Sequence, residues 1–444
     1  MPIGEVESLD HEGRGITRLN GKTVFVEGAL PGERVEYASF RSKPSHEIAS
    51  TLTVLQASPA RVAPPCPHYG VCGGCSMQHF DPLAQVAAKQ RLLEANLWHL
   101  SRLKAEVLYA PIYGEAWGYR HRARLSVRYV SGKGGALIGF HEKKSSYIAD
   151  MHQCAILPPA LSARLPALHA LVEQLSIRDR LPQIELAVGE RVTALVLRIL
   201  APLSGADRRL LEEFADRYAV VIYQQPQGPA SARPLHPADV PPLTYALPEY
   251  GVQFAFSPTE FTQVNPLINQ LLVRRAMTLL APQAGERIAD LFCGLGNFAL
   301  PLARAGAYVV GIEGGAELVA RAKANAQANA LAERTDFRVA DLFAVTPAEV
   351  AAWGSFDKML IDPPREGAVA LIKSLDENSA PERLLYVSCN PATLARDAGI
   401  LVKQKGYRLR GAGVINMFPH TSHVESIALF EREPASSLID EPQL

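Results

Sequence analysis

The sequence has little of what marks membrane, secreted or fibrous proteins. Its six cysteines in 444 residues are too few and too unevenly spaced for a disulfide scaffold. No stretch approaches the roughly 18 uncharged apolar residues that a membrane helix needs, and the start, MPIGEVESLD, lacks a basic region followed by an apolar core. The 33 prolines and 32 glycines follow no period, which excludes a collagen-like or coiled-coil protein. We expect a cytoplasmic globular protein that contacts no membrane.

Charge is balanced over the whole chain but not along it. Lys plus Arg and Asp plus Glu each number 45, so the bulk field of the protein does not draw it to a polyanion. Residues 58–150, however, hold twelve basic and six acidic side chains. A surface that binds a polyanion is therefore expected to be local and to come from this part of the chain.

Residues 1–57 predict a small all-β barrel. Short alternating segments are separated by turn signals, and Asn20-Gly21 marks a hairpin. The next stretch, SPARVAPPCP, has four prolines in ten residues and can continue neither a sheet nor a helix. A domain boundary near residue 58 follows.

Residues 58–257 predict a domain of the α+β class. One amphipathic helix is expected over 79–104, with Asp81 as N-cap and Pro82 in the first turn. Residues 119–150 and 184–223 alternate like antiparallel strands, whereas 159–176 and 205–218 have helical spacing. The segment 224–250, rich in Pro, Gln and Ser, predicts a loop.

After residue 258 the chain alternates strand and helix patterns. Five apolar runs are separated by helical patterns, at 287–292, 308–312, 335–339, 357–361 and 384–388. This rhythm predicts a doubly wound parallel sheet of the α/β class. Two further runs, 407–415 and 426–430, predict a closing pair of strands at the sheet edge.

A glycine-rich turn follows the first of these strand patterns. CGLGNFA, residues 293–299, has the form G-x-G-x-x-A, and Glu313 ends the next strand pattern, 19 residues after Gly294. Such glycines let the backbone approach a ligand, and the acid can accept hydrogen bonds from ribose hydroxyls. NAD, FAD and S-adenosylmethionine all bind such turns, and some turns of this form bind nothing. Asp290, inside the strand pattern, favours S-adenosylmethionine.

Three reactive or polar side chains are predicted to meet at one edge of the sheet. Asp362 follows the fourth strand pattern, Cys389 follows the fifth, and Glu425 precedes the last run. In an open α/β sheet, ligands bind outside the carboxyl ends of the strands. Because the last strand runs antiparallel, its first residue lies at that same edge, so we expect these groups in one crevice.

A thiol, a carboxylate and a methyl donor in one crevice indicate methylation at C5 of uracil. This carbon is too weak a nucleophile to attack a methylsulfonium directly, but thiolate addition to C6 makes an enolate whose C5 can attack. A base must then remove the C5 proton so that the thiolate is expelled. Cys389 suits the first role and Glu425 the second. The alternatives are a small buried side chain for Cys389 and a solvated carboxylate for Glu425.

The motifs of the last third closely resemble those of the RNA uracil-C5 methyltransferases. The segments that carry the resemblance are FSPTEFTQVNP (256–266), DLFCGLGNFALPLA (290–303), GIE (311–313), DPPREGA (362–368), VSCNPATLARD (387–397) and MFPHTSHVES (417–426). The N-terminal barrel resembles a TRAM domain of OB type, and with the cysteine set the chain resembles the branch of the family that acts on a uridine of the 1939 type in 23S ribosomal RNA.

The resemblance implies a Rossmann-like class I methyltransferase domain over 258–433, followed by a tail at 434–444. It implies Cys389 as nucleophile and Glu425 as the base that takes the C5 proton. It further implies that S-adenosylmethionine is contacted by Gln263, Phe292, Asn297, Glu313, Asp341 and Asp362. Gln263 and Asp341 carry no signal of their own in the sequence.

Four cysteines form a candidate metal site in the middle domain. Cys66, Cys72 and Cys75 lie in a glycine-rich loop, and Cys154 is the spare partner in this part of the chain. Four thiolates can hold a zinc ion or a 4Fe-4S cluster, and the spacing does not choose between them. The family resemblance favours the 4Fe-4S cluster. Nearby His68 and His79 are expected at the surface, and His420 and His423 in a loop, rather than as ligands.

The segment YRHRARLSVRY, residues 119–129, predicts an RNA-binding strand. Arg120, Arg122 and Arg124 fall on one face, with Arg128 in register, where they could hold phosphates while the tyrosines stack on bases. A solvated strand face is the alternative. OB-type barrels often bind single-stranded nucleic acid, but residues 1–57 are slightly acidic, so few contacts are expected there.

Three other functions compete with methylation of 23S ribosomal RNA. A uracil-C5 methyltransferase that acts on transfer RNA would share the chemistry, although such enzymes generally lack both the barrel and the cysteines. An NAD-linked oxidoreductase that uses the cluster for electron transfer would leave Cys389 and Glu425 without a role. A non-catalytic RNA-binding protein would need neither these residues nor the glycine-rich turn. We expect a monomer without an obligate protein partner.

Overall fold

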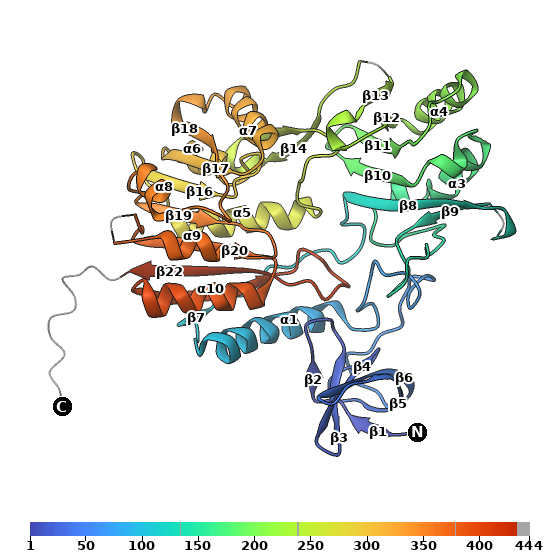
Figure 1. The fold of residues 1–444 in the computed structure, drawn as a ribbon, viewed down its shortest axis with the longest axis horizontal. Coiled ribbons are helices and arrows are strands. Elements are labelled where there is room, and N and C mark those ends of the chain that lie inside the picture. Colours follow the sequence, from blue (N-terminus) through green and yellow to red (C-terminus); the bar gives the residue numbers. More distant parts are fainter. Residues whose placement is uncertain (134, 238, 378, 433–444) are drawn as a thin grey trace.

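The computed structural model describes residues 1–133, 135–237, 239–377 and 379–432. Figure 1 shows a small β domain below a larger body that has two parts, one from the middle of the chain and one from its last third. The β domain has six strands, β1 (Ile3–Glu5), β2 (Ser8–Leu9), β3 (Gly15–Leu19), β4 (Lys22–Glu27), β5 (Arg34–Ser42) and β6 (His46–Gln56). Their order in the sheet is β1-β5-β6-β4-β3-β2.

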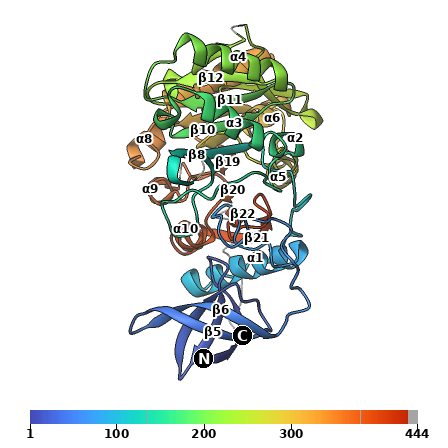
Figure 2. The same ribbon diagram turned by 90° about the vertical axis from the view of Figure 1, so that its right-hand side faces the viewer.

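The first nine residues close this sheet on itself. β1 pairs with β5, whereas β2, three residues later, pairs with β3 at the opposite edge of the sheet. Between them, Val6 N donates to Glu33 O at 2.9 Å and Glu7 N donates to Ile16 O at 2.8 Å. The prediction of an all-β N-terminal part is confirmed, and Figure 2 shows this closed sheet beneath helix α1.

The next helix, α1 (Pro82–Asn96), begins as predicted. The Asp81 side chain accepts hydrogen bonds from Leu83 N and Ala84 N, and Pro82 is the first residue. The predicted end at residue 104 was wrong, because a π-helical turn (Leu97–Ser101) follows and Arg102 then takes a left-handed backbone, with φ of 58°. Buried α1 residues such as Leu93 pack into the core of the last third of the chain.

The middle part is a six-stranded sheet with helices on one face. Its strands are β8 (Arg122–Val130), β9 (Gly135–Gly139), β10 (Gln183–Val188), β11 (Thr193–Arg198), β12 (Val221–Gln225) and β13 (Arg233–His236), in the order β13-β12-β11-β10-β8-β9. The helices are α2 (Pro159–Ser162), α3 (Leu165–Gln174) and α4 (Gly205–Tyr218). The other face of the sheet shares a core with the last third of the chain.

Two predictions for this middle part were wrong. β12 runs parallel to β11 and not antiparallel, because α4 carries the chain back to the starting edge of the sheet. The segment 224–250 contains β13 and β14 (Leu243–Leu247), and β14 pairs with β15 (Val252–Phe256). Because these strands are short and lie among Pro, Gln and Ser residues, the sequence pattern did not predict them.

The last third is a doubly wound sheet, as predicted. Its strands are β16 (Arg287–Leu291), β17 (Tyr308–Glu313), β18 (Thr335–Val339), β19 (Lys358–Ile361), β20 (Arg383–Ser388), β21 (Tyr407–Ile415) and β22 (Glu425–Arg432), with β7 (Val107–Leu108) added at the edge. The order is β18-β17-β16-β19-β20-β22-β21-β7, and β22 is antiparallel to both neighbours. The expected edge pair 407–415 and 426–430 is thus confirmed as β21 and β22.

Helices cover both faces of this sheet. α5 (Pro266–Leu280), α6 (Ala299–Arg304) and α7 (Ala316–Ala328) pack on one face. α8 (Pro347–Ala352), α9 (Val369–Ser374) and α10 (Pro391–Gln404) pack on the other face together with α1. This layering leaves the carboxyl edge of the strands open.

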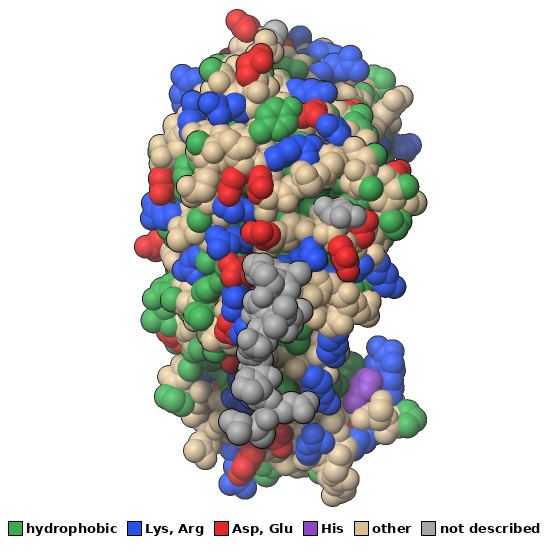
Figure 3. All heavy atoms as spheres, turned by 90° about the vertical axis from the view of Figure 1, so that its left-hand side faces the viewer, with side chains coloured by type: hydrophobic (Ala, Val, Ile, Leu, Met, Phe, Trp, Pro, Cys, Tyr) green, Lys and Arg blue, Asp and Glu red, His purple; other side chains and the backbone are tan. Residues whose placement is uncertain are grey.

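The surface over the last third carries mixed charge. Figure 3 shows basic and acidic side chains interspersed on the face that it presents, which agrees with equal numbers of basic and acidic residues in the chain. Within the described residues, no helix combines the length and the apolar character needed to span a bilayer.

Candidate active site

Most of the predicted site residues meet at the carboxyl edge of the doubly wound sheet. Those that end a parallel strand or lie within two residues of its end are Phe292, Glu313, Asp341, Asp362 and Cys389. Glu425 begins β22, and the next residue, Ser426, pairs with Ser388. The antiparallel strand therefore brings Glu425 beside Cys389.

The glycine-rich turn is tied to the end of β17 by the backbone. Gly294 and Gly296 both have left-handed φ values, 55° and 97°, which side chains disfavour. Gly294 N donates to one Glu313 carboxylate oxygen at 3.1 Å, and Gly315 N donates to the other at 3.1 Å. Glu313 is thereby held in one position at the mouth of the turn, with lone pairs left for a ligand.

Two aromatic rings flank this turn. Phe292 has φ of 62°, and its ring centroid lies 5.5 Å from that of Phe343, whose side chain is half exposed. Asp341 is exposed, and its carboxylate accepts a hydrogen bond from Phe343 N at 2.9 Å. Asp341 thus shapes the turn that presents Phe343. Sequence reasoning missed Phe343, because a lone aromatic after a strand gives no signal.

Asn297 is part of an amide network. Its Oδ1 accepts from Asn269 Nδ2 at 2.9 Å and from the Tyr245 hydroxyl at 3.0 Å, while its Nδ2 donates to Asn269 Oδ1 at 3.0 Å. Asn269 is buried on α5, and Tyr245 comes from β14. These two partners, from elements far apart in the sequence, fix the direction of the Asn297 amide.

Gln263 lies in the segment that joins β15 to α5, which Arg122 holds. The Arg122 guanidinium donates to Pro258 O at 2.6 Å, to Glu260 O, and to Thr262 Oγ1 at 3.4 Å. The prediction of an exposed arginine ladder was therefore wrong for Arg122, which holds protein carbonyls in place of phosphates. Elsewhere in the ladder, Arg124 is exposed but pairs with Glu185 at 3.0 Å.

Burial raises the pKa of three acidic groups in the crevice, and neighbouring carboxylates raise it further for two of them. Burial raises the pKa of Asp362 to about 7. Burial, and then the charge of Asp362, raise the pKa of Glu425 to about 8. Burial, and then Glu425 and Asp362, raise the pKa of Cys389 to about 12, against the opposing effect of Arg365. A positive charge bound in this crevice would therefore lower these pKa values and favour the thiolate and the carboxylates.

Asp290 lies directly beneath the crevice. It has no exposed surface, and burial, with further effects from Asp362 and Glu313, raises its pKa well above its ordinary value. Next to it, Cys293 is buried and burial raises the pKa of its thiol.

Comparisons with known proteins identify the family. A family model described as tRNA (Uracil-5-)-methyltransferase matches residues 246–433, and the TRAM domain model matches residues 5–36. A 23S rRNA (uracil(1939)-C(5))-methyltransferase of Dechloromonas aromatica is 61% identical over 97% of this chain and 100% of its own length. The chain belongs to the 23S rRNA (uracil(1939)-C(5))-methyltransferase family. Members from Aromatoleum aromaticum and Burkholderia thailandensis are 60% and 59% identical over 97% of this chain, and over 100% and 95% of their own lengths.

A solved structure supports the fold of this family member. The crystal structure of Pyrococcus abyssi tRNA (uracil-54, C5)-methyltransferase in complex with S-adenosyl-L-homocysteine matches with a TM-score of 0.74 and 24% identity. The match covers 96% of this chain and 99% of that chain. The predicted class I methyltransferase fold and the TRAM domain are thus confirmed.

In this member of the 23S rRNA (uracil(1939)-C(5))-methyltransferase family, the four predicted cysteine ligands line one cavity. Cys66, Cys72, Cys75 and Cys154 all face it, with Phe140 and Met151 as apolar walls. Burial, and with it the neighbouring cysteines, raise the pKa of Cys75 to about 12 and that of Cys154 to about 11. Four close thiolates need a cationic partner, so the donor set fits a metal or a metal cluster.

A second group of possible metal ligands lies near these cysteines. Among the described residues, Asp150, His152 and His169 have ligand atoms that all lie within 4.8 Å of one another. His79, expected at the surface, is buried, because Tyr69 and the residues after Cys75 cover it.

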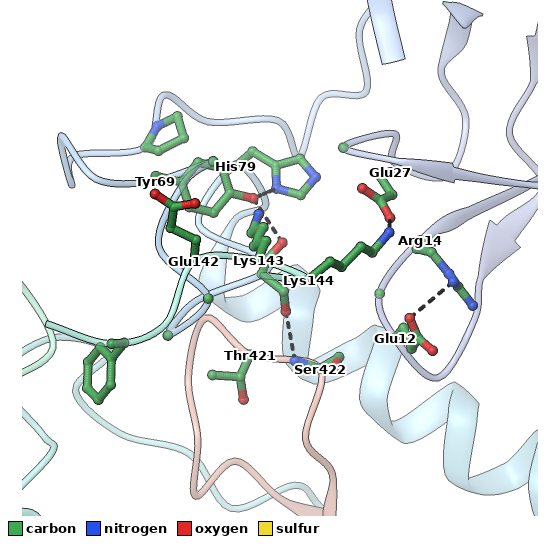
Figure 4. Close-up of a pocket in the computed structure, with 18 of the residues that line it drawn as sticks. Glu12, Arg14, Glu27, Tyr69, His79, Glu142, Lys143, Lys144, Thr421 and Ser422 are labelled. Atoms are coloured by element: carbon green, nitrogen blue, oxygen red, sulfur yellow. Dashed lines mark hydrogen bonds and ion pairs between the residues drawn. The ribbon is translucent and has the colours of Figure 1, made fainter. Parts of the chain in front are cut away.

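A basic groove runs between the TRAM domain and the cysteine loop. Its lining has five basic side chains and three acidic ones, together with the segment 421–423: Arg14, Arg61, Arg120, Lys143, Lys144, Glu12, Glu27 and Glu142. Figure 4 shows Lys144 extended toward Glu27 of the TRAM domain, while Lys143 lies 4.7 Å from the centre of the Tyr69 ring. A neighbouring hollow contains Cys389, and both hollows include Glu12, Ser422 and His423. A continuous surface thus leads from the groove to the thiol.

Proposed function

We propose that this protein methylates C5 of a specific uridine in 23S ribosomal RNA, a uridine of the 1939 type, with S-adenosylmethionine as methyl donor. Membership of the family supports the reaction and the RNA. The observation that carries the proposal is the pairing of β20 with β22, which brings Cys389 and Glu425 together beside the glycine-rich turn.

We assign Cys389 as nucleophile and Glu425 as base. The Cys389 thiolate forms a bond to C6 of uracil, and C5 then takes the methyl group. The Glu425 carboxylate removes the C5 proton, the C5–C6 double bond re-forms, and the C6–S bond breaks to release the thiolate. The Arg365 charge lowers the pKa of Cys389 and is a candidate activator within the chain.

Six residues are proposed to bind the methyl donor, which supplies the methyl group on a positively charged sulfur. Glu313 has free lone pairs for ribose hydroxyls, and Phe292, packed against Phe343, offers an apolar surface for a base. Asp362 adds negative charge near the sulfonium. Asn297, Asp341 and Gln263 complete the set, on the family resemblance and on their places around the same edge.

We propose that the cysteines hold a 4Fe-4S cluster. Four thiolates can hold either a zinc ion or a 4Fe-4S cluster. Cys66, Cys72, Cys75 and Cys154 line one cavity and so supply the complete ligand set, and the family resemblance favours the cluster over zinc.

The basic groove between the TRAM domain and the cysteine loop is proposed to hold the RNA. Lys143 and Arg120 supply positive charge, whereas Lys144 and Arg61 are paired with Glu27 and Glu33. The groove leads to the hollow of Cys389, where a flipped uridine could enter. On this basis we divide the chain into an RNA-binding domain at 1–57, a cysteine-containing domain at 58–257 and a methyltransferase domain at 258–433. The tail at 434–444 lies outside the described residues. Because its RNA partner is ribosomal, we place the protein in the cytoplasm. We also propose that it is a monomer.

The competing functions fit less well. The full-length relatives are named for 23S rRNA, which disfavours transfer RNA as the substrate. An NAD-linked oxidoreductase gives Cys389 and Glu425 no role, and binding of S-adenosylhomocysteine without binding of NAD would exclude it. A non-catalytic RNA-binding protein does not need the paired thiol and carboxylate.

The decisive experiment uses an RNA fragment that carries 5-fluorouridine at the target. The C5 fluorine cannot leave as a proton does, so incubation with S-adenosylmethionine is expected to trap a protein–RNA adduct on a denaturing gel. The band should vanish in Cys389→Ala. Methylation of ordinary uridine without a trapped band would refute thiol addition, and failure of both would refute the assigned RNA.

A further inference from the structure

The loop that leads to Glu425 is held by residues from outside the methyltransferase domain. This loop, residues 416–424, joins β21 to β22, and Ile415 pairs with Glu425 at its base. From α1, buried Lys89 donates to Asn416 Oδ1 at 2.8 Å and to Phe418 O at 2.9 Å. From the segment before β8, the Tyr119 hydroxyl donates to Pro419 O at 2.9 Å.

His420 makes several of the contacts that hold this loop. Its carbonyl accepts from both Ser76 N and Met77 N at 2.9 Å, and its own N donates to Gln85 Oε1 at 2.8 Å. Its ring stacks on that of Trp117, with centroids 3.7 Å apart and planes 22° apart. His420 is 1% exposed. Its φ of 64° is left-handed, a conformation that a residue with a side chain keeps only where its surroundings hold it.

Gln85 connects the loop to the segment after Cys75. While its Oε1 accepts from His420, its Nε2 donates to Met77 O at 2.9 Å and to Phe80 O at 2.7 Å. Gln85 has no exposed surface. One buried amide therefore joins both segments, and neither can move far without breaking its bonds.

The cysteine site lies at the other end of this connection. Ser76 and Met77 follow Cys75 directly, and the Ser76 hydroxyl accepts a further hydrogen bond from Ser422 N at 3.1 Å. The Tyr69 hydroxyl, from the same cysteine loop, donates to Ser76 O at 2.9 Å. Whatever fixes the position of Cys75 therefore also fixes the partners of His420.

We propose that Gln85, Lys89 and the backbone of residues 75–77 are positioning residues for Glu425, and that the metal group bound by the cysteines sets their position. This inference rests on the proposed function. It gives the cluster a role in the proton-abstraction step without any electron transfer. Misplacement of Glu425 leaves the Cys389 thiol in place, so the adduct still forms, but the C5 proton is no longer within reach of the carboxylate.

The first test uses Lys89→Met and Gln85→Ala, with Arg91→Met as the matched control on an exposed position of α1. The chain has three tryptophans, and Trp98→Phe with Trp353→Phe leaves Trp117 as the single reporter of its stacking on His420. We expect a changed Trp117 emission in the Lys89 and Gln85 variants and none in the control.

With ordinary uridine RNA, the same two variants are expected to accumulate the methylated adduct. Adduct formation should stay at the wild-type rate, while its resolution slows by about 10²-fold, the order of loss that an ångström of misplacement causes. Because the enzyme then accumulates as the adduct, kcat and KM for the RNA are expected to fall together, and kcat/KM stays near the wild-type value. A purely structural role would instead lower the melting temperature and leave the balance between adduct and product unchanged, which would overturn the inference.

The second test removes a metal ligand that comes from another segment of the chain than Cys75, with Cys154→Ser. We expect the same change in Trp117 emission and the same slow resolution as in Lys89→Met. An unchanged Trp117 signal in a metal-free Cys154→Ser protein would overturn the role given to the metal group. These measurements distinguish failure of the proposed function from failure of this inference. If the wild type forms no adduct, the proposed function is refuted. If Lys89→Met behaves like the wild type, only the positioning role is refuted.

Discussion

Replacement of Glu425 by glutamine is expected to stabilise the protein in a pH-dependent way. Glu425 is 4% exposed at the start of β22, and burial with the nearby Asp362 raises its pKa from 4.5 to about 8. The folded protein therefore binds this proton more tightly than the unfolded chain does. Glutamine keeps the shape of the side chain and carries no charge at any pH.

The sign of the effect follows from the two pKa values. Below pH 4.5 the carboxyl group is protonated in both states, and wild type and Glu425→Gln should have equal free energies of unfolding. Between pH 4.5 and about 8 the unfolded chain loses the proton while the folded protein keeps it, so wild-type stability falls as pH rises. Above pH 8 the difference reaches a plateau. At about 1.4 kcal/mol per pH unit, the raised pKa sets a ceiling of about 5 kcal/mol.

Urea unfolding of the two proteins at pH 4.5, 7 and 9 measures this difference. We expect the advantage of Glu425→Gln to grow from near zero to on the order of 1–5 kcal/mol across this range. Glu366→Gln, at an exposed position of the neighbouring loop, is the matched control and should show no such trend. A difference that is independent of pH would refute the view that Glu425 is buried as a neutral acid.

Two further predictions concern the cysteines and the segment held by Arg122. Protein purified without oxygen should be brown and contain about four irons per chain. A colourless protein with one zinc would refute the cluster. The His152→Ala variant is the control for metal bound by Asp150, His152 and His169. Arg122→Ala should weaken S-adenosylhomocysteine binding about tenfold, a loss of about 1.4 kcal/mol, because the carbonyls of Pro258 and Glu260 lose their donor next to Gln263. Calorimetric titration measures this loss, and unchanged affinity would show that Gln263 does not depend on Arg122.

Patterns that depend on neighbours in the chain were predicted well. The five parallel strands, the edge pair β21 and β22, the all-β N-terminal part and the Asp81 cap all follow from periodicity or capping within a few residues. The meeting of Asp362, Cys389 and Glu425 was also predictable, because the direction of each strand decides which residues end at the ligand-binding edge. Short strands among prolines, such as β13 and β14, gave too weak a local signal.

Whether a long polar side chain is buried or exposed was not predictable in the same way. Arg122 has the same place in the sequence pattern as Arg124, yet one holds the carbonyls before α5 and the other is exposed. Lysine is rarely buried, yet Lys89 of α1 is buried against the loop of residues 416–424. Each outcome depends on which distant segment packs over the side chain.

The sequence by itself determined the fold class, the order of the motifs and the chemistry available at the sheet edge, because strand and helix periods and turn residues act locally. The tertiary structure alone decided which charges are buried and how Gln85 and His420 connect the cysteine loop to Glu425. Burial and hydrogen bonding depend on contacts between residues hundreds of positions apart, and no local pattern encodes those contacts.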